Sequence, residues 1–157
     1  MLEIKKILVP IDFSDYSLKA LDYAIDFAAL AKAELFIVNV IEPIVYPTDF
    51  TMGEVVPTFE STIEVNFSEQ LKKIAEEKIG DKLNYHLLTK EGRPFLEIIG
   101  AAKETDADLI IIATHGHTGM EHILFGSTAE KVVRKAPCPV LSLRDPVKGF
   151  TYGNNEK

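Results

Sequence analysis

The feature that most constrains this chain is the stretch Asp108–Leu143, in which an apolar run leads through a glycine-containing loop into a helix. Leu109–Ala113 is unbroken, rich in β-branched residues and too short for an ordinary helix, so we expect a buried parallel strand there. The loop after it contains Gly116, Gly119 and Gly126. This order of elements is typical of phosphate sites, because the free amides at a helix start favour negative charge. The stretch is therefore a candidate anion site.

The helix after this loop is expected to begin at Ser127 and to end before Pro137. Its apolar positions recur at helical spacing and predict one apolar face, formed by Ala129, Val132, Val133 and Ala136. Ser127 and Glu130 also match a capping box, in which the Ser127 side chain accepts a hydrogen bond from the Glu130 amide. Glu130 must then point away from a bound phosphate or pair with a cation. A last short strand is expected over Cys138–Leu143.

The glycine spacing matches neither of two familiar phosphate loops, since it contains no Gly-Lys-Ser/Thr and no G-x-G-x-x-G. It resembles the nucleotide-binding signature of the universal stress protein family, Gly-x2-Gly-x9-Gly-Ser/Thr after the fourth strand. Gly116 matches the second glycine, and Gly126 with Ser127 matches the terminal pair. Ala113 stands where the first glycine is expected. The opening KKILVPIDFSDYSLKALDYA and the ending APCPVLSL resemble the family too, so the likeness covers nearly the whole chain.

Apolar segments with strand and helix patterns alternate along the chain. Buried strands are expected at Ile7–Val9 and Leu35–Ile41, with Ser14 as the N-cap of the helix between them. A charged helix that ends at Gly80 and a more exposed edge strand at Leu83–Leu87 follow. Strands and helices alternate five times, which predicts a doubly wound α/β sheet with its three most apolar strands in the centre.

The family resemblance makes this architecture more specific. It implies a five-stranded parallel, Rossmann-like sheet of order 3-2-1-4-5, whose C-terminal edge strand forms a two-fold dimer. It also implies a nucleotide-binding domain over residues 1–145, followed by a polar tail over 146–157. Between residues 42 and 60 the pattern breaks in a long, apolar, proline-containing segment, for which we expect packing over a site or against another subunit, or else a disordered insertion.

Asp12 follows the first strand directly, at the sheet edge where ligands bind in folds of this class. It is expected to accept hydrogen bonds from ribose hydroxyls or to lie near a metal on the phosphates, the alternative being local capping of the first helix. In nucleotide-binding relatives the main chain at the end of the second strand, here Val40, pairs with the adenine edge. The resemblance implies a contact set at the ends of three strands and the start of one helix: Pro10, Ile11, Asp12, Val40, Ile112, Ala113, Thr114, His115, Gly116, His117, Gly126, Ser127 and Thr128.

Ala113, the histidines after it and Cys138 bear on the chemistry of the site. Ala113 is expected to keep a negative φ at the end of a strand, and to weaken nucleotide binding without abolishing it. The histidines His115, His117 and His122 match no zinc pattern, so no metal bound directly by the protein is expected. Cys138 is expected to be a small apolar side chain at a strand start. No Ser/His/Asp or Cys/His arrangement is recognisable, so no catalytic residue is predicted.

Composition excludes several classes of protein. The 157 residues are 46% hydrophobic and suit one domain with a sizeable core. A net charge of −7 argues against a nucleic-acid or anionic-membrane surface. The single cysteine excludes an internal disulfide, and no apolar run is long enough to span a membrane. The first residues lack the apolar core of a signal peptide, so a cytoplasmic location is expected.

The resulting hypothesis is an ATP-binding or other adenine-nucleotide-binding stress protein. It would act as a homodimeric, nucleotide-dependent switch, with Mg²⁺ held by the phosphates and slow hydrolysis or none. Two alternatives stay open: a nucleotide-free interaction module, which Ala113 favours, and an enzyme of electron-transfer or adenylating type on the same fold.

Overall fold

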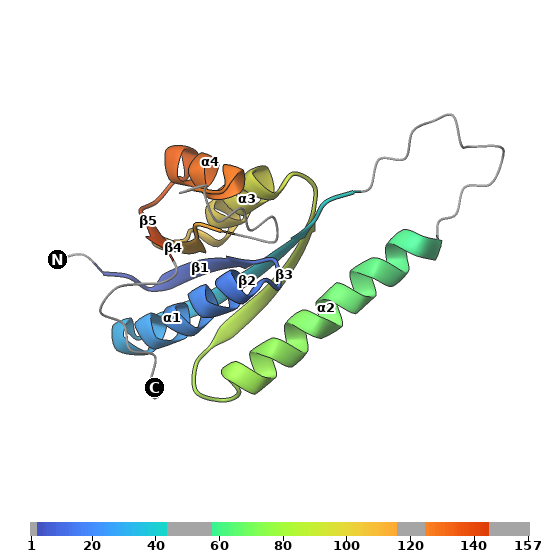
Figure 1. The fold of residues 1–157 in the computed structure, drawn as a ribbon. Helices are drawn as coiled ribbons and strands as arrows, with labels where there is room; N and C mark the ends of the chain where they lie inside the picture. The colour runs from blue at the N-terminus through green and yellow to red at the C-terminus, as the bar shows by residue number, and fades with distance from the viewer. Residues whose placement is uncertain (1–2, 44–57, 116–124, 145–157) are drawn as a thin grey trace, which may run out of the picture.

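The computed structural model describes residues 3–43, 58–115 and 125–144, and only the backbone over 58–65. Within these ranges strands and helices alternate along the chain (Figure 1). The strands are β1 (Lys6–Ile11), β2 (Glu34–Ile41), β3 (Tyr85–Glu91), β4 (Leu109–Ala113) and β5 (Val140–Leu143). The helices are α1 (Asp15–Ala31), α2 (Thr58–Lys78), α3 (Pro94–Thr105) and α4 (Ser127–Lys135). The strands pair in parallel in the order β3-β2-β1-β4-β5, which confirms the expected topology.

Helices cover both faces of the sheet, α1 and α2 on one and α3 and α4 on the other (Figure 1). Strand alternation sends Ile7 and Val9 into the α1–α2 core, whereas Leu8 enters the α3–α4 core. The central strands β1, β2 and β4 supply most of the fully buried residues, because a parallel sheet covered on both faces buries both sets of side chains. The prediction that the three most apolar strands are central is therefore confirmed.

Helix ends follow the local signals in the sequence. Ser14 is the N-cap of α1, and its side-chain oxygen accepts from the Ser17 amide at 3.2 Å, as predicted. Pro94 occupies the first turn of α3, where its missing N–H costs nothing. After α2, Gly80 adopts a φ of +54° and donates to the Ala75 carbonyl, which ends the helix in a left-handed turn.

Several predicted strand bounds were wrong. The first strand was expected over Ile7–Val9, but β1 continues through Pro10 to Ile11. Proline is tolerated there because, within the described residues, β1 pairs with β4 only at Ile7 and Leu8, so no ladder hydrogen bond to β4 is lost. The edge strand expected at Leu83–Leu87 is β3 at Tyr85–Glu91, and β5 begins at Val140 and not at Cys138.

Two predictions about helices were also wrong. Helix α2 begins at Thr58, so the irregular segment expected up to residue 60 is shorter by its last three positions. Proline at position 57 explains this boundary, since a helix tolerates proline only at its start. In α4, Ala129 and Val132 are buried, but Val133 is 45% exposed, so the apolar stripe is narrower than its spacing suggested. Residues 44–57 of the 42–60 segment lie outside the described residues.

No helix in the described part of the chain is long and apolar enough to cross a membrane.

Candidate functional site

The carboxyl ends of β1 and β4 lie side by side where the winding of the sheet reverses. The two strands pair directly, with Ile7 opposite Leu109 and Leu8 opposite Ile110. The segment after β1 and the segment after β4 therefore leave the same edge of the sheet. In doubly wound folds this edge is where ligands bind.

The β1–α1 turn holds Asp12 in a network of short-range hydrogen bonds. The Asp12 carboxylate accepts from the Ser14 amide at 3.0 Å and from the Ser14 hydroxyl, while the Asp12 amide donates to the Ser17 hydroxyl at 3.2 Å. Phe13 between them adopts a φ of +64°, which is costly for a bulky residue. Its ring stacks on Phe67 of α2 at 5.7 Å between centroids. The N-cap of α1 is Ser14, so Asp12 supports the cap residue and does not take the N-cap position itself, as the alternative raised from the sequence would have it. A carboxylate can accept from more donors than these two.

At the end of β4, Thr114 ties three segments together. Thr114 is 2% exposed, and its amide donates to the Leu143 carbonyl of β5 at 2.9 Å. Its carbonyl accepts from the Gly126 amide at 2.6 Å. A Cβ at Gly126 would lie 3.0 Å from the Thr114 carbonyl oxygen, which is tighter than ordinary contact. The glycine is therefore needed for the approach of the α4 start to β4.

His115 and Tyr16 join the two halves of this edge. The Thr114 hydroxyl and the His115 Nδ1 are 3.0 Å apart. The His115 ring lies 5.4 Å from the ring of Tyr16, in the first turn of α1. Since Tyr16 follows Asp12 closely in the chain, this contact brings the end of β4 next to the Asp12 turn.

The amino end of α4 differs from the predicted capping box. The N-cap is Gly126, whose carbonyl accepts from the Glu130 amide at 3.0 Å. Ser127 is the first helical residue, so its side chain does not bond that amide. No side chain of the described residues caps this helix end, which leaves the first amides available to an anion. Glu130 pairs with Arg134 at 3.4 Å, so this carboxylate has the cationic partner that a nearby phosphate site requires.

The predicted contact residues at the strand ends have side chains that pack into the core, so mainly their backbone groups are accessible to a ligand. Ile11 fills the α1–α2 core, while Ile112 and Val40 pack into the α3–α4 core. Pro10 is also buried. Ala113 ends β4 and does not have a positive φ, as expected. A ligand at this edge would therefore meet backbone groups of these residues. Thr128 is half-buried, and Ser127 is exposed.

The predicted features that fall outside the described residues are Gly116, His117, Gly119, His122 and the tail over 146–157. Within the described ranges no group of three His, Cys, Asp or Glu residues could hold a metal ion. Cys138 is half-buried against the α3–α4 core. Burial, and to a lesser extent the Asp108 carboxylate, raises the pKa of the Cys138 thiol. The thiol is therefore kept in its poorly nucleophilic neutral form.

Sequence reasoning missed Asn39, Tyr16 and Phe13. The signal for Asn39 is a polar residue inside the apolar run of β2. It is buried beside the end of β1, and its side-chain amide donates to the Ile11 carbonyl at 3.0 Å. Tyr16 and Phe13 gave no signal, because their roles depend on contacts with His115 and Phe67, which are distant in sequence.

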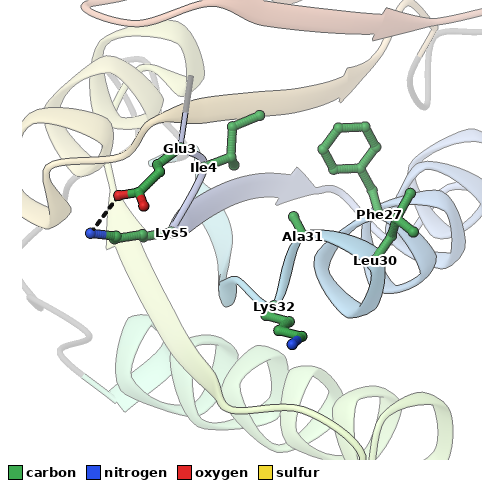
Figure 2. A pocket seen from close by; sticks show the side chains of 7 residues that line it. All are labelled: Glu3, Ile4, Lys5, Phe27, Leu30, Ala31 and Lys32. Carbon is green, nitrogen blue, oxygen red and sulfur yellow. Dashed lines mark ion pairs between the residues drawn. The ribbon is translucent and has the colours of Figure 1, made fainter. Parts of the chain in front are cut away.

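A separate depression of about 440 Å³ lies at the opposite end of the sheet. Figure 2 shows it between the start of the chain, from Glu3 to Lys5, and the end of α1, from Phe27 to Lys32. Its charged groups include an exposed Glu3–Lys5 ion pair at 2.8 Å. Such a pair adds little binding energy. The depression is remote from the strand ends that carry Asp12 and Thr114.

Comparison with known proteins agrees with this fold. The model of the universal stress protein family matches residues 3–144. Universal stress protein MJ0531 of Methanocaldococcus jannaschii is 38% identical over 146 residues, covering 92% of this chain and 84% of the relative. The solved structure of MJ0577, from the same organism, superposes with a TM-score of 0.77 at 27% identity, covering 91% of this chain and 97% of that one.

A universal stress protein from Archaeoglobus fulgidus, solved in complex with dAMP, superposes with a TM-score of 0.60 at 26% identity. That comparison covers 90% of this chain and 98% of the other. The family match spans nearly the whole chain, and the topology is the one implied by the resemblance in the sequence. The chain belongs to the universal stress protein family.

Proposed function

We propose that this protein binds an adenine nucleotide, with ATP as the expected ligand, at the carboxyl ends of β1 and β4. The observation that carries the proposal is the amino end of α4, which has no side-chain cap among the described residues and is held beside the Asp12 turn. Free amides at a helix start suit a phosphate. The dAMP complex of the A. fulgidus relative supports a nucleotide as the source of that phosphate.

In this proposal each predicted segment contacts a different part of the ligand. The phosphates lie over the α4 amides near Gly126, Ser127 and Thr128, together with Gly116 and His117. The Asp12 carboxylate accepts from the ribose hydroxyls, and the Val40 main chain pairs with the base. A carboxylate and uncapped amides suit these partners chemically, since one accepts from hydroxyls and the other donates to anions. Mg²⁺ is held by the phosphate oxygens.

The nucleotide acts as a switch and not as a substrate turned over rapidly. Phosphoryl transfer needs a residue that orients the attacking water and a cation that stabilises the transition state. The predicted contact set contains no such pair, so hydrolysis is slow or absent. Occupancy changes partner choice in a cytoplasmic stress response, by favouring one conformation or association state over another. The binding unit spans residues 1–145, with 146–157 as a polar tail.

We also propose that the protein forms a homodimer through β5. This strand is at one end of the sheet order and pairs only with β4 among the described strands. Leu141 and Leu143 lie on the α1–α2 side but remain half-buried. An edge strand with partly exposed apolar residues favours pairing with a second copy.

The alternative is a nucleotide-free interaction module. It is favoured by Ala113 at the position of a family glycine and by the bonding of Asp12 to Ser14. Isothermal titration with ATP, ADP and AMP, together with mass spectrometry of any ligand released from the purified protein, separates the two functions. Saturable heat with at least one nucleotide is expected. No heat and no released adenine nucleotide would leave the interaction module as the better description.

A further inference from the structure

Asn39 is a buried polar residue whose side-chain nitrogen is hydrogen-bonded and whose side-chain oxygen is not, among the residues that the structure describes. It is 4% exposed, and its Nδ2 donates to the Ile11 carbonyl at 3.0 Å. Its Oδ1 is buried and has no hydrogen-bond partner among the described residues. Buried polar atoms are normally paired, so an exception calls for a physical reason.

Packing alone does not explain an asparagine at this position. Leu35 and Ile37 precede it at intervals of two on β2 and point into the α1–α2 core. A leucine in place of Asn39 would continue this apolar row and would remove the unpaired oxygen. The group that a leucine cannot supply is the Nδ2 donor to Ile11. This hydrogen bond is therefore the feature that distinguishes asparagine from an apolar residue.

The bond acts at the point where β1 ends. Ile11 is the last residue of β1 and lies opposite Asn39 in the strand register. The chain then turns through Asp12 and Phe13 into α1. The Ile11 carbonyl belongs to the same planar peptide unit as the Asp12 amide, so fixing one fixes the orientation of the other. That amide is also held from the far side by the Ser17 hydroxyl at 3.2 Å.

We propose that Asn39 is a positioning residue of the nucleotide site, which orients the Ile11–Asp12 peptide and through it the Asp12 carboxylate toward the ribose. This inference rests on the proposed nucleotide-binding function. It assigns to Asn39 an effect on the sugar end of the ligand and not on its phosphates. Asn39 does not contact the ligand in this account.

The test compares ATP with 2′,3′-dideoxy-ATP, which has the same base and phosphates but lacks both ribose hydroxyls. Dissociation constants are measured by titration calorimetry for the wild type, Asn39→Leu, Asp12→Ala and the double variant. The wild type should prefer ATP. Asn39→Leu should bind ATP about five- to tenfold more weakly, the effect of one well-placed hydrogen bond, and dideoxy-ATP nearly as well as the wild type does. The double variant should bind ATP no more weakly than Asp12→Ala alone, because both changes remove one interaction.

Ile37→Val is the matched control, since it alters the same face of β2 without removing a hydrogen bond. It should leave the preference for ATP over dideoxy-ATP unchanged, and thermal unfolding verifies that every variant is folded. Equal weakening of both ligands by Asn39→Leu, additive losses in the double variant, or no loss at all would overturn the positioning role. If the wild type binds neither ligand, the proposed function itself fails, and the role of Asn39 fails with it. That outcome is recognised from the wild type alone.

Discussion

At the scale of single residues, Gly126 is required because a side chain would come too close to Thr114, and not because its backbone conformation excludes other residues. Its φ of −66° suits any residue, but a Cβ would lie 3.0 Å from the Thr114 carbonyl oxygen. Gly126→Ala should lengthen the hydrogen bond between these residues and lower the free energy of unfolding by ~1 kcal/mol or more. ATP binding should weaken severalfold, because the α4 amides shift. Urea unfolding and titration calorimetry measure the two effects.

Gly100 in α3 provides the control for Gly126. A Cβ there would meet no atom within 4 Å. Alanine is favoured over glycine in a helix interior, so Gly100→Ala should stabilise the protein by roughly 0.5–1 kcal/mol. Similar effects of the two alanine variants would contradict the role given to close approach at Gly126.

Phe13 gives a second prediction at this scale. Its left-handed backbone conformation lowers the stability of the fold, whereas the stacking of its ring raises it. Its φ is +64°, and its ring stacks on Phe67. Both Phe13→Ala and Phe13→Gly lose the stacked ring. Glycine alone also removes the backbone cost, so Phe13→Gly should be more stable than Phe13→Ala by ~1 kcal/mol in chemical denaturation.

Phe67 lies in the interior of α2, where the order should reverse. Phe67→Ala should be more stable than Phe67→Gly by ~1 kcal/mol, because glycine is the poorer helix former. If the alanine variant is the more stable one at Phe13 as well as at Phe67, the backbone of Phe13 carries no strain.

Residues whose roles depend on local sequence were predictable, and residues whose roles depend on distant contacts were not. Ser14 was identified as an N-cap because it stands between a strand and a helical pattern. The capping box at Ser127 was wrong although its sequence matched, because the Gly126 backbone is held by Thr114 and takes the N-cap position itself. Asn39 escaped notice, since the carbonyl it binds belongs to a strand paired with its own through the sheet.

At the scale of elements, the sheet was predictable because an unbroken hydrophobic run indicates a strand that is buried on both faces of the sheet. The three most apolar strands are central, and β3 is at the edge, with its partly exposed residues. The order of the strands came from resemblance to the family, since apolarity alone cannot say which central strands are neighbours. The apolar face of α4 was predicted too wide, because it included the exposed Val133. The spacing of apolar residues does not show how far the neighbouring elements extend over a helix.

The proposed dimer can be tested at β5. The carbonyls of Pro139 and Leu143 accept from the Ile110 and Thr114 amides. Alternation along the strand therefore directs the Ser142 amide toward the open edge. Ser142→Pro removes that donor at a position where an edge strand tolerates proline. It should convert a dimer into a monomer in light scattering after size exclusion, whereas Ser142→Thr should remain dimeric. A wild-type monomer, or a dimer that persists with proline, would exclude pairing through this edge.

At the scale of the whole molecule, ligand binding and folding are linked. A nucleotide that binds only the folded state adds ~2.7 kcal/mol of stability at a concentration one hundred times its dissociation constant. For a chain of this length the melting temperature should then rise by roughly 5–10 °C. Differential scanning fluorimetry with and without ATP measures the shift.

Ser127→Glu separates ligand binding from stability in the same assay. A carboxylate in the first turn of a helix favours the helix dipole, so the variant should melt no lower than the wild type without ligand. The same charge repels phosphate, so ATP should no longer raise the melting temperature. A full ATP shift in Ser127→Glu would place the phosphates away from α4.

The hydrogen bond between the Gly126 amide and the Thr114 carbonyl has a consequence for the tolerance of this chain to changes in loop length. It closes the base of the segment that joins β4 to α4, so strand and helix keep their relative position whatever lies between them. Doubling the length of a closed loop costs only about 0.6 kcal/mol. Insertions between these two anchor residues should therefore lower the stability of this fold only slightly, even where they abolish nucleotide binding by changing the spacing of the signature.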